Sequence, residues 1–160
     1  MNHRQIRDLI RKTLQRMNMW SEDAEELVFL TGMVESGYKY IYQLGSGIAR
    51  SFYQVEAFTA KDSLDNYLSY RKDKLGDFAL ALQRSPEELL DMSEKDLQEL
   101  LWHDMAAGIA FCRIKYRRVP EAIPGDLEGM ARYWKKYYNT EHGAGTVKHF
   151  LDMAAEREDK

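Results

Sequence analysis

Long apolar runs and cysteines are what this sequence lacks most. No stretch approaches the roughly 20 apolar residues that are needed to span a bilayer, so we expect no membrane span. The first segment is polar and basic, with no apolar stretch behind it, which predicts synthesis in the cytoplasm without a signal peptide. The single cysteine, Cys112, excludes a disulfide within the chain and favours a reducing compartment for its synthesis.

Metal-ligand spacing is also missing. The four histidines are neither paired along a helix turn nor joined by further ligands, so we expect no metal and no cofactor. The formal net charge is -3, and the basic clusters at 4–16 and 113–118 are not accompanied by any nucleic-acid-binding motif. We therefore expect no nucleic acid partner and interpret both clusters as solvated faces. Oligomeric state is left open by the sequence.

Helical periodicity dominates what is present. Apolar residues recur at steps of three and four along most of the chain, which predicts one mainly α-helical domain over 1–160. We expect seven or eight helices around one core, beginning with an amphipathic helix within 1–19 and ending in a frayed tail at 156–160. The longest predicted helix covers 94–118, and Gly108 on its apolar face indicates close approach of another segment.

Residues 37–58 differ from the rest of the chain. They are rich in aromatic and β-prone residues and are interrupted by Gly45 and Gly47, which predicts a small irregular or β lobe with one short hairpin. Loops that are held by a rigid scaffold often carry function. We expect exposed tyrosine rings in this lobe, namely Tyr38, Tyr40, Tyr42 and Tyr53, although those at 38–42 could instead cap the core with their hydroxyls outward.

Glu35 stands at the end of an apolar helical run and is followed by Ser36 and Gly37. A glycine directly after a periodic segment is a helix-stop signal, because it adopts the left-handed cap conformation without strain. The partial negative charge of a helix C-terminus and apolar neighbours both disfavour ionisation, so we expect the pKa of Glu35 to be raised. A carboxyl group that keeps its proton near neutral pH is what a general acid requires.

Three short motifs follow one another along the chain. They are Glu35-Ser36 with Gln54 nineteen residues after Glu35, then Asp104 with Gly108 and Phe111, and finally Tyr138-Asn139 with Gly143, Gly145 and Val147. In this order they resemble the lysozyme-like superfamily, and within it the soluble lytic transglycosylases and goose-type lysozymes. The chain departs from the family pattern at Ser51, Asp104 and Phe111, where the family has Gly, Asn and Tyr. These departures concern substrate contacts more than the fold.

The resemblance implies cleavage of the β-1,4 bond between N-acetylmuramic acid and N-acetylglucosamine in peptidoglycan, with Glu35 as general acid and base. A transglycosylase would need no second carboxylate, whereas a hydrolase would use one, for which Glu56 is the candidate and Asp62 a weaker one. Tyr138 matches the family residue that orients the acid. The remaining expected contacts with peptidoglycan glycan strands are Ser36, Tyr53, Gln54 and Asn139.

Two other interpretations compete with this one. The chain could be a non-enzymatic virion or adaptor protein that keeps the fold as a scaffold, since fold does not fix function. It could also be a helical module that binds a partner through its basic first helix. An enzyme without a signal peptide needs another route to the cell wall, and a bacteriophage origin, as a lysis protein or virion component, would supply one.

Overall fold

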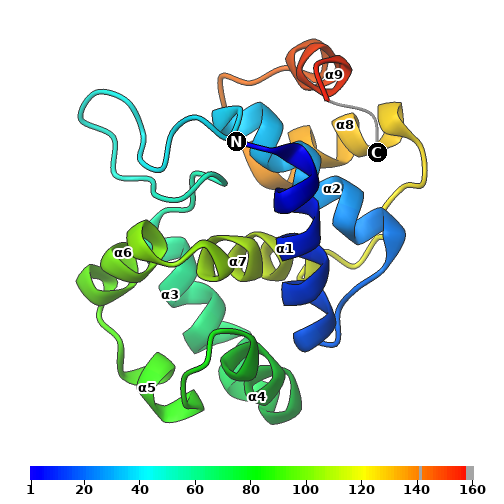
Figure 1. Ribbon diagram of the computed structural model, residues 1–160. Coiled ribbons are helices and arrows are strands. Elements are labelled where there is room, and N and C mark those ends of the chain that lie inside the picture. Colours follow the sequence, from blue (N-terminus) through cyan, green and yellow to red (C-terminus); the bar gives the residue numbers. More distant parts are fainter. Residues whose placement is uncertain (141, 158–160) are drawn as a thin grey trace.

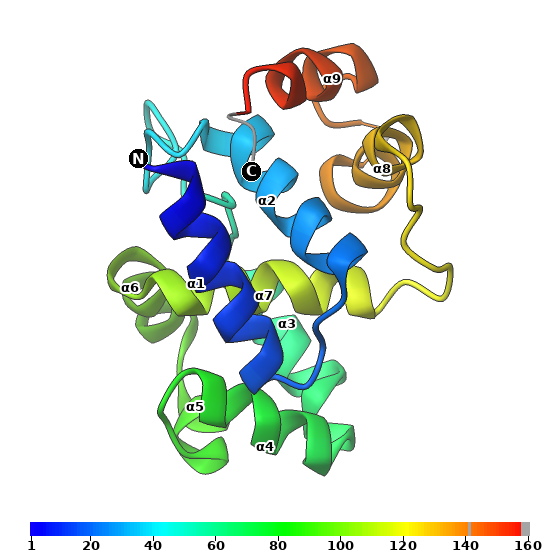
Figure 2. The same ribbon diagram turned by 45° about the vertical axis from the view of Figure 1, so that its right-hand side comes forward.

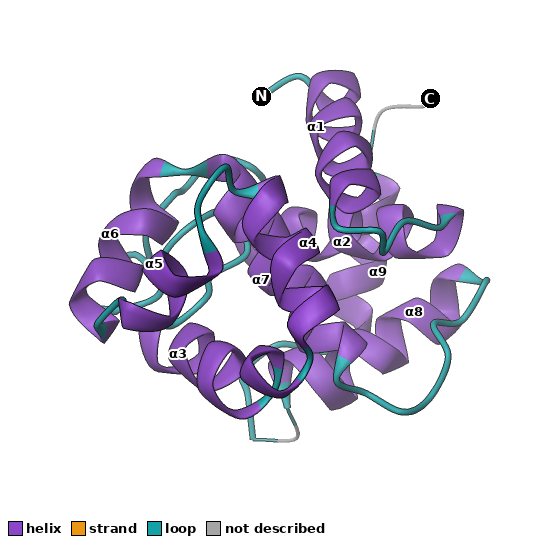
Figure 3. Cartoon of the chain, turned by 90° about the horizontal axis from the view of Figure 1, so that it is seen from below, coloured by secondary structure: helices purple, strands orange, loops and turns teal. Residues whose placement is uncertain are grey.

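The computed structural model describes residues 1–140 and 142–157. This part of the chain contains nine α-helices, one 3-10 helix (η1) and one π-helical turn (η2). Their bounds are α1 His3–Arg16, α2 Glu22–Ser36, α3 Ala57–Asn66, η1 Leu68–Tyr70, α4 Lys72–Ala81, α5 Pro86–Asp91, α6 Glu94–His103, α7 Met105–Arg117, α8 Leu127–Trp134, η2 Lys135–Asn139 and α9 Val147–Ala155. The mainly α-helical prediction is confirmed, and the described residues form no strand (Figure 3).

Helix α7 lies at the centre of this arrangement (Figures 1 and 2). It packs against α1, α2, α3, α4, α6 and η2, and its residues from Ala107 to Ile114 are buried. A buried hydrogen bond of 2.8 Å between the hydroxyls of Thr31 and Tyr116 joins α2 to α7. Helix α9 covers the other side of α2 and also packs on α8. The central helix therefore fixes where the C-terminal end of α2 lies.

Both ends of α2 carry capping residues, and the one at the C-terminal end is the Gly37 that the sequence indicates. The Ser21 hydroxyl accepts a hydrogen bond from the Ala24 amide at the start of the helix. At the other end Gly37 has a φ of 60° in the left-handed region, and its amide donates to the Met33 carbonyl. The prediction that Glu35 lies in the last turn of a helix is confirmed.

The segment that connects α2 to α3 is irregular, as predicted, but it ends two residues earlier than expected because α3 begins at Ala57. The predicted hairpin is reduced to two isolated antiparallel bridges, Tyr42 with Arg50 and Arg50 with Val55. We call residues 37–56 the irregular lobe. Two of its tyrosines, Tyr38 and Tyr53, are buried in the core, so the expectation that they are exposed is wrong.

Several predicted helix boundaries are also wrong. The single helix expected over 94–118 is two helices, because Asp104 leaves the helical conformation and caps α7 by accepting a hydrogen bond from the Ala107 amide. The first helix ends at Arg16, and Asn18 beyond it has a left-handed φ of 56°. With this split the described residues contain nine α-helices, more than the seven or eight expected. Within the predicted tail at 156–160, residues 158–160 lie outside the described residues.

The close approach that Gly108 indicated is real. A Cβ atom at Gly108 would lie 2.7 Å from the Ser51 Cβ, so α7 and the irregular lobe touch at this point. Ser51 itself has a φ of 65°, in the region that favours glycine, and its hydroxyl accepts a hydrogen bond from the Tyr53 amide. The Ser51–Gly108 contact thus holds the part of the irregular lobe that leads to Gln54.

We expect Gly108→Ala to lower the free energy of unfolding by about 1–3 kcal/mol, because the new methyl group overpacks the contact with Ser51. In a Ser51→Gly background the clashing atoms are gone, and the penalty should shrink. Urea unfolding of the four variants of this cycle measures the coupling.

The matched control is Gly76→Ala in α4, where a Cβ meets nothing within 4 Å. This substitution should raise stability by roughly 0.5–1 kcal/mol through helix propensity alone. If Gly108→Ala carried the same penalty in the native and in the Ser51→Gly backgrounds, the proposed contact would be contradicted.

Candidate functional site

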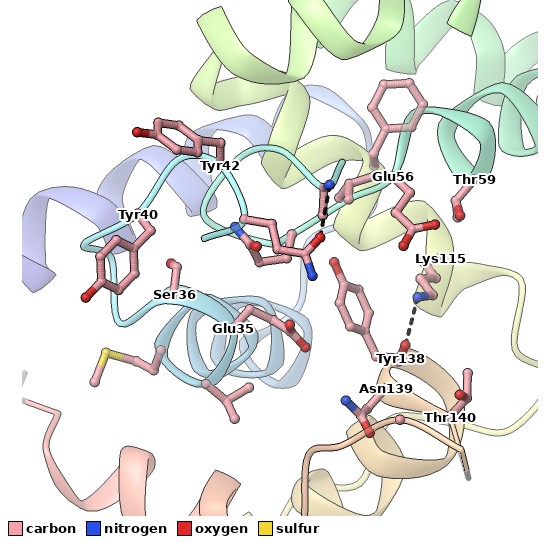
Figure 4. Close-up of a pocket in the computed structure, with 18 of the residues that line it drawn as sticks. Glu35, Ser36, Tyr40, Tyr42, Glu56, Thr59, Lys115, Tyr138, Asn139 and Thr140 are labelled. Carbon is pink, nitrogen blue, oxygen red and sulfur yellow. Dashed lines mark hydrogen bonds between the residues drawn. The ribbon is translucent and has the colours of Figure 1, made fainter. Parts of the chain in front are cut away.

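A cleft of about 880 Å³ opens at the C-terminal end of α2. Its walls come from the end of α2, the irregular lobe, the start of α3, the end of α7, and η2 with the loop that follows it. Figure 4 shows Glu35 in the middle of this cleft, between Tyr40 and Tyr42 on one side and Glu56, Lys115 and Thr140 on the other. The volume is in the range of sites that bind small molecules or segments of polymers.

Glu35 is half-buried at the floor of the cleft. Burial raises the pKa of its carboxyl group above the ordinary value of 4.5, because the charged form loses hydration. A hydrogen bond from Trp134 and the positive charge of Lys115 act in the opposite direction, and burial outweighs them. The carboxyl group therefore holds its proton to a higher pH than a solvated glutamate does.

Trp134 is the residue that fixes this carboxyl group. Its indole Nε1 donates to the Glu35 Oε1 over 3.0 Å. The indole ring is 1 % exposed and packs on Phe150 of α9. Gly145 lies against the same ring so closely that a side chain there would collide with it. The sequence did not show that Trp134 meets Glu35, which lies 99 residues before it.

The two ends of α2 offer an internal comparison. Glu25, in the first turn, also accepts a hydrogen bond from an indole, that of Trp20, over 2.7 Å. Burial would raise its pKa too, but hydrogen bonds from Arg11 and Trp20 more than compensate and the pKa is lowered. Glu35 has an indole and no guanidinium beside it. Both glutamates accept a hydrogen bond from an indole, but Glu25 is also paired with Arg11, and their pKa values are shifted in opposite directions.

Lys115 is a second site residue that the sequence did not reveal. It lies near the end of α7, half-buried in the cleft, and its Nζ donates to the Tyr138 carbonyl over 2.8 Å and lies 4.1 Å from the centre of the Tyr138 ring. Burial lowers the pKa of its ammonium group below the ordinary value of 10.5, and this effect outweighs the negative charges of Glu35 and Glu56, which act in the opposite direction. In the sequence it was only one of several basic residues at 113–118.

Tyr138 and Asn139 line the cleft, but neither makes the contact expected of the Tyr138 position. The Tyr138 hydroxyl donates to the Tyr53 carbonyl over 2.6 Å, and the hydrogen bond that Glu35 accepts comes from Trp134. The expectation that Tyr138 orients the acid is therefore wrong. The indole of Trp134, one helical turn earlier, makes this contact. The Asn139 side-chain oxygen accepts from Lys135 over 2.8 Å.

The remaining predicted site residues divide into two groups. Ser36, Gln54 and Glu56 all line the cleft together with Glu35. The Ser36 hydroxyl donates to the Gly32 carbonyl over 3.2 Å, and the Gln54 amide donates to the Ser51 carbonyl over 2.9 Å. Asp62 forms an ion pair of 2.7 Å with Arg118 and does not line the cleft, so it is not a partner of Glu35.

The predicted contact of substrate with the Tyr53 side chain is wrong. Tyr53 is 2 % exposed, and its hydroxyl lies 3.4 Å from that of Tyr38 inside the core. The alternation of aromatic and polar residues in the irregular lobe did not show which rings turn inward. The tyrosines of the irregular lobe that do line the cleft are Tyr40 and Tyr42, which are about half exposed.

Among residues 1–140 and 142–157, no group of three His, Cys, Asp or Glu residues is placed to hold a metal ion. In the same part of the chain, no helix is long and apolar enough to cross a membrane. Comparison of the chain with protein-family models, curated proteins and solved structures gives no match. The site must therefore be interpreted from its own geometry.

Titration of the indole protons tests this geometry directly. Trp20 and Trp134 each donate to a glutamate, so their ¹H–¹⁵N indole signals should move as Glu25 and Glu35 ionise. We expect the Trp134 signal to shift with a midpoint above 4.5 and the Trp20 signal with a midpoint below it. Glu35→Gln should abolish the Trp134 transition and leave that of Trp20.

Two further variants separate the roles of Trp134 and Tyr138. Trp134→Phe keeps an aromatic ring and removes the donor, so the pKa of Glu35, followed by ¹³C carboxyl shifts, should rise further. Tyr138→Phe is the matched control and should leave this pKa close to its value in the unmodified protein. An equal response to the two substitutions would show that Trp134 does not hold the acid.

Proposed function

We propose that the chain is a lysozyme-like enzyme that cleaves the β-1,4 glycosidic bond of peptidoglycan between N-acetylmuramic acid and N-acetylglucosamine. The observation that carries the proposal is Glu35, a half-buried acid with a raised pKa at the floor of an open cleft. A group of this kind can protonate a glycosidic oxygen at a pH where a solvated glutamate is ionised.

The proposed first step is proton transfer from Glu35 to the oxygen of the leaving sugar as the glycosidic bond breaks. In a transglycosylase the ionised Glu35 would then take the proton of the muramyl 6-hydroxyl, which attacks the anomeric carbon and leaves a 1,6-anhydro end. In a hydrolase a water molecule would attack, with Glu56 placing it or stabilising the positively charged transition state. The indole of Trp134 would stabilise Glu35 in its ionised form in either route.

The remainder of the cleft supports a glycan ligand. Its lining combines the exposed rings of Tyr40 and Tyr42 with the hydroxyl group of Thr59 and the amide groups of Gln54 and Asn139, whereas the Ser36 hydroxyl is buried and bonded to the backbone of Gly32 and Tyr38. Aromatic rings suit the apolar faces of sugars, and neutral polar groups suit their hydroxyl and acetamido groups. Of the three departures from the family pattern, Ser51 is buried against Gly108 and Asp104 caps α7, whereas Phe111 lines the cleft.

We place the action of this enzyme at the bacterial cell wall, reached as a bacteriophage lysis protein or virion component. The negative net charge is unfavourable for a freely diffusing wall enzyme, since cell walls are anionic. The alternative of a non-enzymatic virion or adaptor protein gains support from Tyr138, whose hydroxyl is committed to the Tyr53 carbonyl and not to Glu35. The two alternatives differ in whether the protein cuts glycan strands.

Incubation with purified peptidoglycan, followed by mass analysis of the released muropeptides, tests the proposal. We expect cleavage by the native protein and a fall of at least about 100-fold with Glu35→Gln, because general acid catalysis contributes that much. Anhydro ends identify a transglycosylase, and Glu56→Gln should then have little effect. Reducing ends identify a hydrolase, and Glu56→Gln should then slow it strongly.

The matched control is Glu128→Gln, at an exposed glutamate on α8 that is paired only with Arg132, and its activity should equal that of the native protein. Absence of cleavage by the folded native protein would reject the enzyme and leave the scaffold alternative. Equal activity of Glu35→Gln and Glu128→Gln would reject Glu35 as the acid.

A further inference from the structure

Lys115 has more hydrogen-bonding capacity than its neighbours use. A lysine ammonium carries three donors, and one of them is directed to the Tyr138 carbonyl. No carboxylate oxygen of the described residues lies within 4.0 Å of the Lys115 Nζ, so this ammonium group forms no ion pair with them. Desolvated charges in proteins are usually paired, so a half-buried cation without a paired anion is a feature that a ligand can complete.

The charge of the cleft lining agrees with an anionic group on the ligand. The lysines and glutamates of the described lining are Lys39 and Lys115 against Glu35 and Glu56. Their formal charges cancel, although the whole chain has a formal net charge of -3, and burial disfavours the charged form of Glu35. Lys39 is exposed, whereas Lys115 is half-buried, so the interaction with Lys115 is less screened by solvent.

The position of Lys115 defines which part of a glycan would meet it. Figure 4 shows Lys115 on the Glu56 and Thr140 side of Glu35, whereas Tyr40 and Tyr42 lie on the opposite side. Sugar rings that stack on the tyrosines and present a linkage to Glu35 would extend toward Lys115. A substituent on a sugar next to the cleaved bond would then reach its ammonium group.

We propose that Lys115 forms a subsite for a carboxylate carried by the muramyl residue of the substrate. This inference rests on the proposed function. Muramic acid differs from glucosamine by a lactyl ether, whose carboxyl group is free in peptide-free glycan and amide-linked where a peptide stem is attached. The carboxylate would come from the free lactyl group in the first case and from the stem peptide in the second. A hydrogen-bonded ion pair with Lys115 serves both sources.

Binding measurements on Glu35→Gln protein separate these sources without cleavage of the ligand. Four tetrasaccharides are compared by calorimetry at low salt. They are the alternating N-acetylglucosamine–N-acetylmuramic acid tetrasaccharide with free lactyl carboxylates, its lactyl methylamide, its lactyl amide with L-Ala-D-Glu, and tetra-N-acetylchitotetraose. We expect at least one carboxylate form to bind about tenfold more tightly than the methylamide, as one charge-assisted hydrogen bond provides.

Substitution of Lys115 by Met in the same background should abolish this preference and leave the affinity for the methylamide within about twofold. Lys115→Arg should retain the preference and shows that the fold tolerates change at this position. Lys39→Met is the matched control, since it removes the same charge from the same cleft at an exposed position, and it should keep most of the preference.

The outcomes distinguish this inference from the function on which it rests. If the methylamide and the carboxylate forms bind equally well, or if Lys115→Met keeps the preference, the carboxylate subsite is wrong while a glycan site remains. An equal loss of affinity for all four ligands in Lys115→Met also overturns it, because Lys115 would then act on the cleft and not on the carboxylate. If none of the four ligands binds, the proposed function itself fails.

Discussion

The burial of one carboxyl group at the C-terminal end of α2 is the constraint on which the site depends. Glu35 cannot be solvated fully, because the irregular lobe, η2 and the end of α7 surround it, and it has no arginine to pair with. At the other end of the same helix, Glu25 is paired with Arg11 and its pKa is lowered. One helix thus holds an acid suited to stabilising structure at its start and an acid suited to proton transfer at its end.

The core places the groups that act on this carboxyl group. Helix α7 is packed from several sides, and it brings Lys115 into the cleft and contacts the irregular lobe through Gly108 and Ser51. Helix α8 supplies Trp134, which follows Glu35 by 99 residues in the sequence. The environment of the Glu35 carboxyl group therefore depends on tertiary packing, and a local change in α8 or α9 would alter its pKa.

Much of the fold and part of the site could be predicted from the sequence, since the relevant signals are local. Gly37 marks the C-terminal end of α2, so the position of Glu35 in its last turn followed directly. Gly108 indicated a close approach that the Ser51 contact explains.

The errors concern choices that only packing decides. The break at Asp104 was hidden, because the apolar periodicity continues through it, and the inward rotation of Tyr38 and Tyr53 follows from core space that no local pattern encodes. Trp134 and Lys115 were missed because a buried indole and a basic residue on a helix are common, and their partners lie far away in sequence.

The most direct test of the central claim is the pH dependence of unfolding for the native protein and for Glu35→Gln. A raised pKa in the folded state means that the folded protein binds the Glu35 proton more tightly than the unfolded chain does. The native protein should therefore lose stability relative to Glu35→Gln as the pH rises above about 4.5, until Glu35 is ionised in the folded state as well. A stability difference that stays constant, or that changes in the opposite direction between pH 4 and 8, would contradict the account.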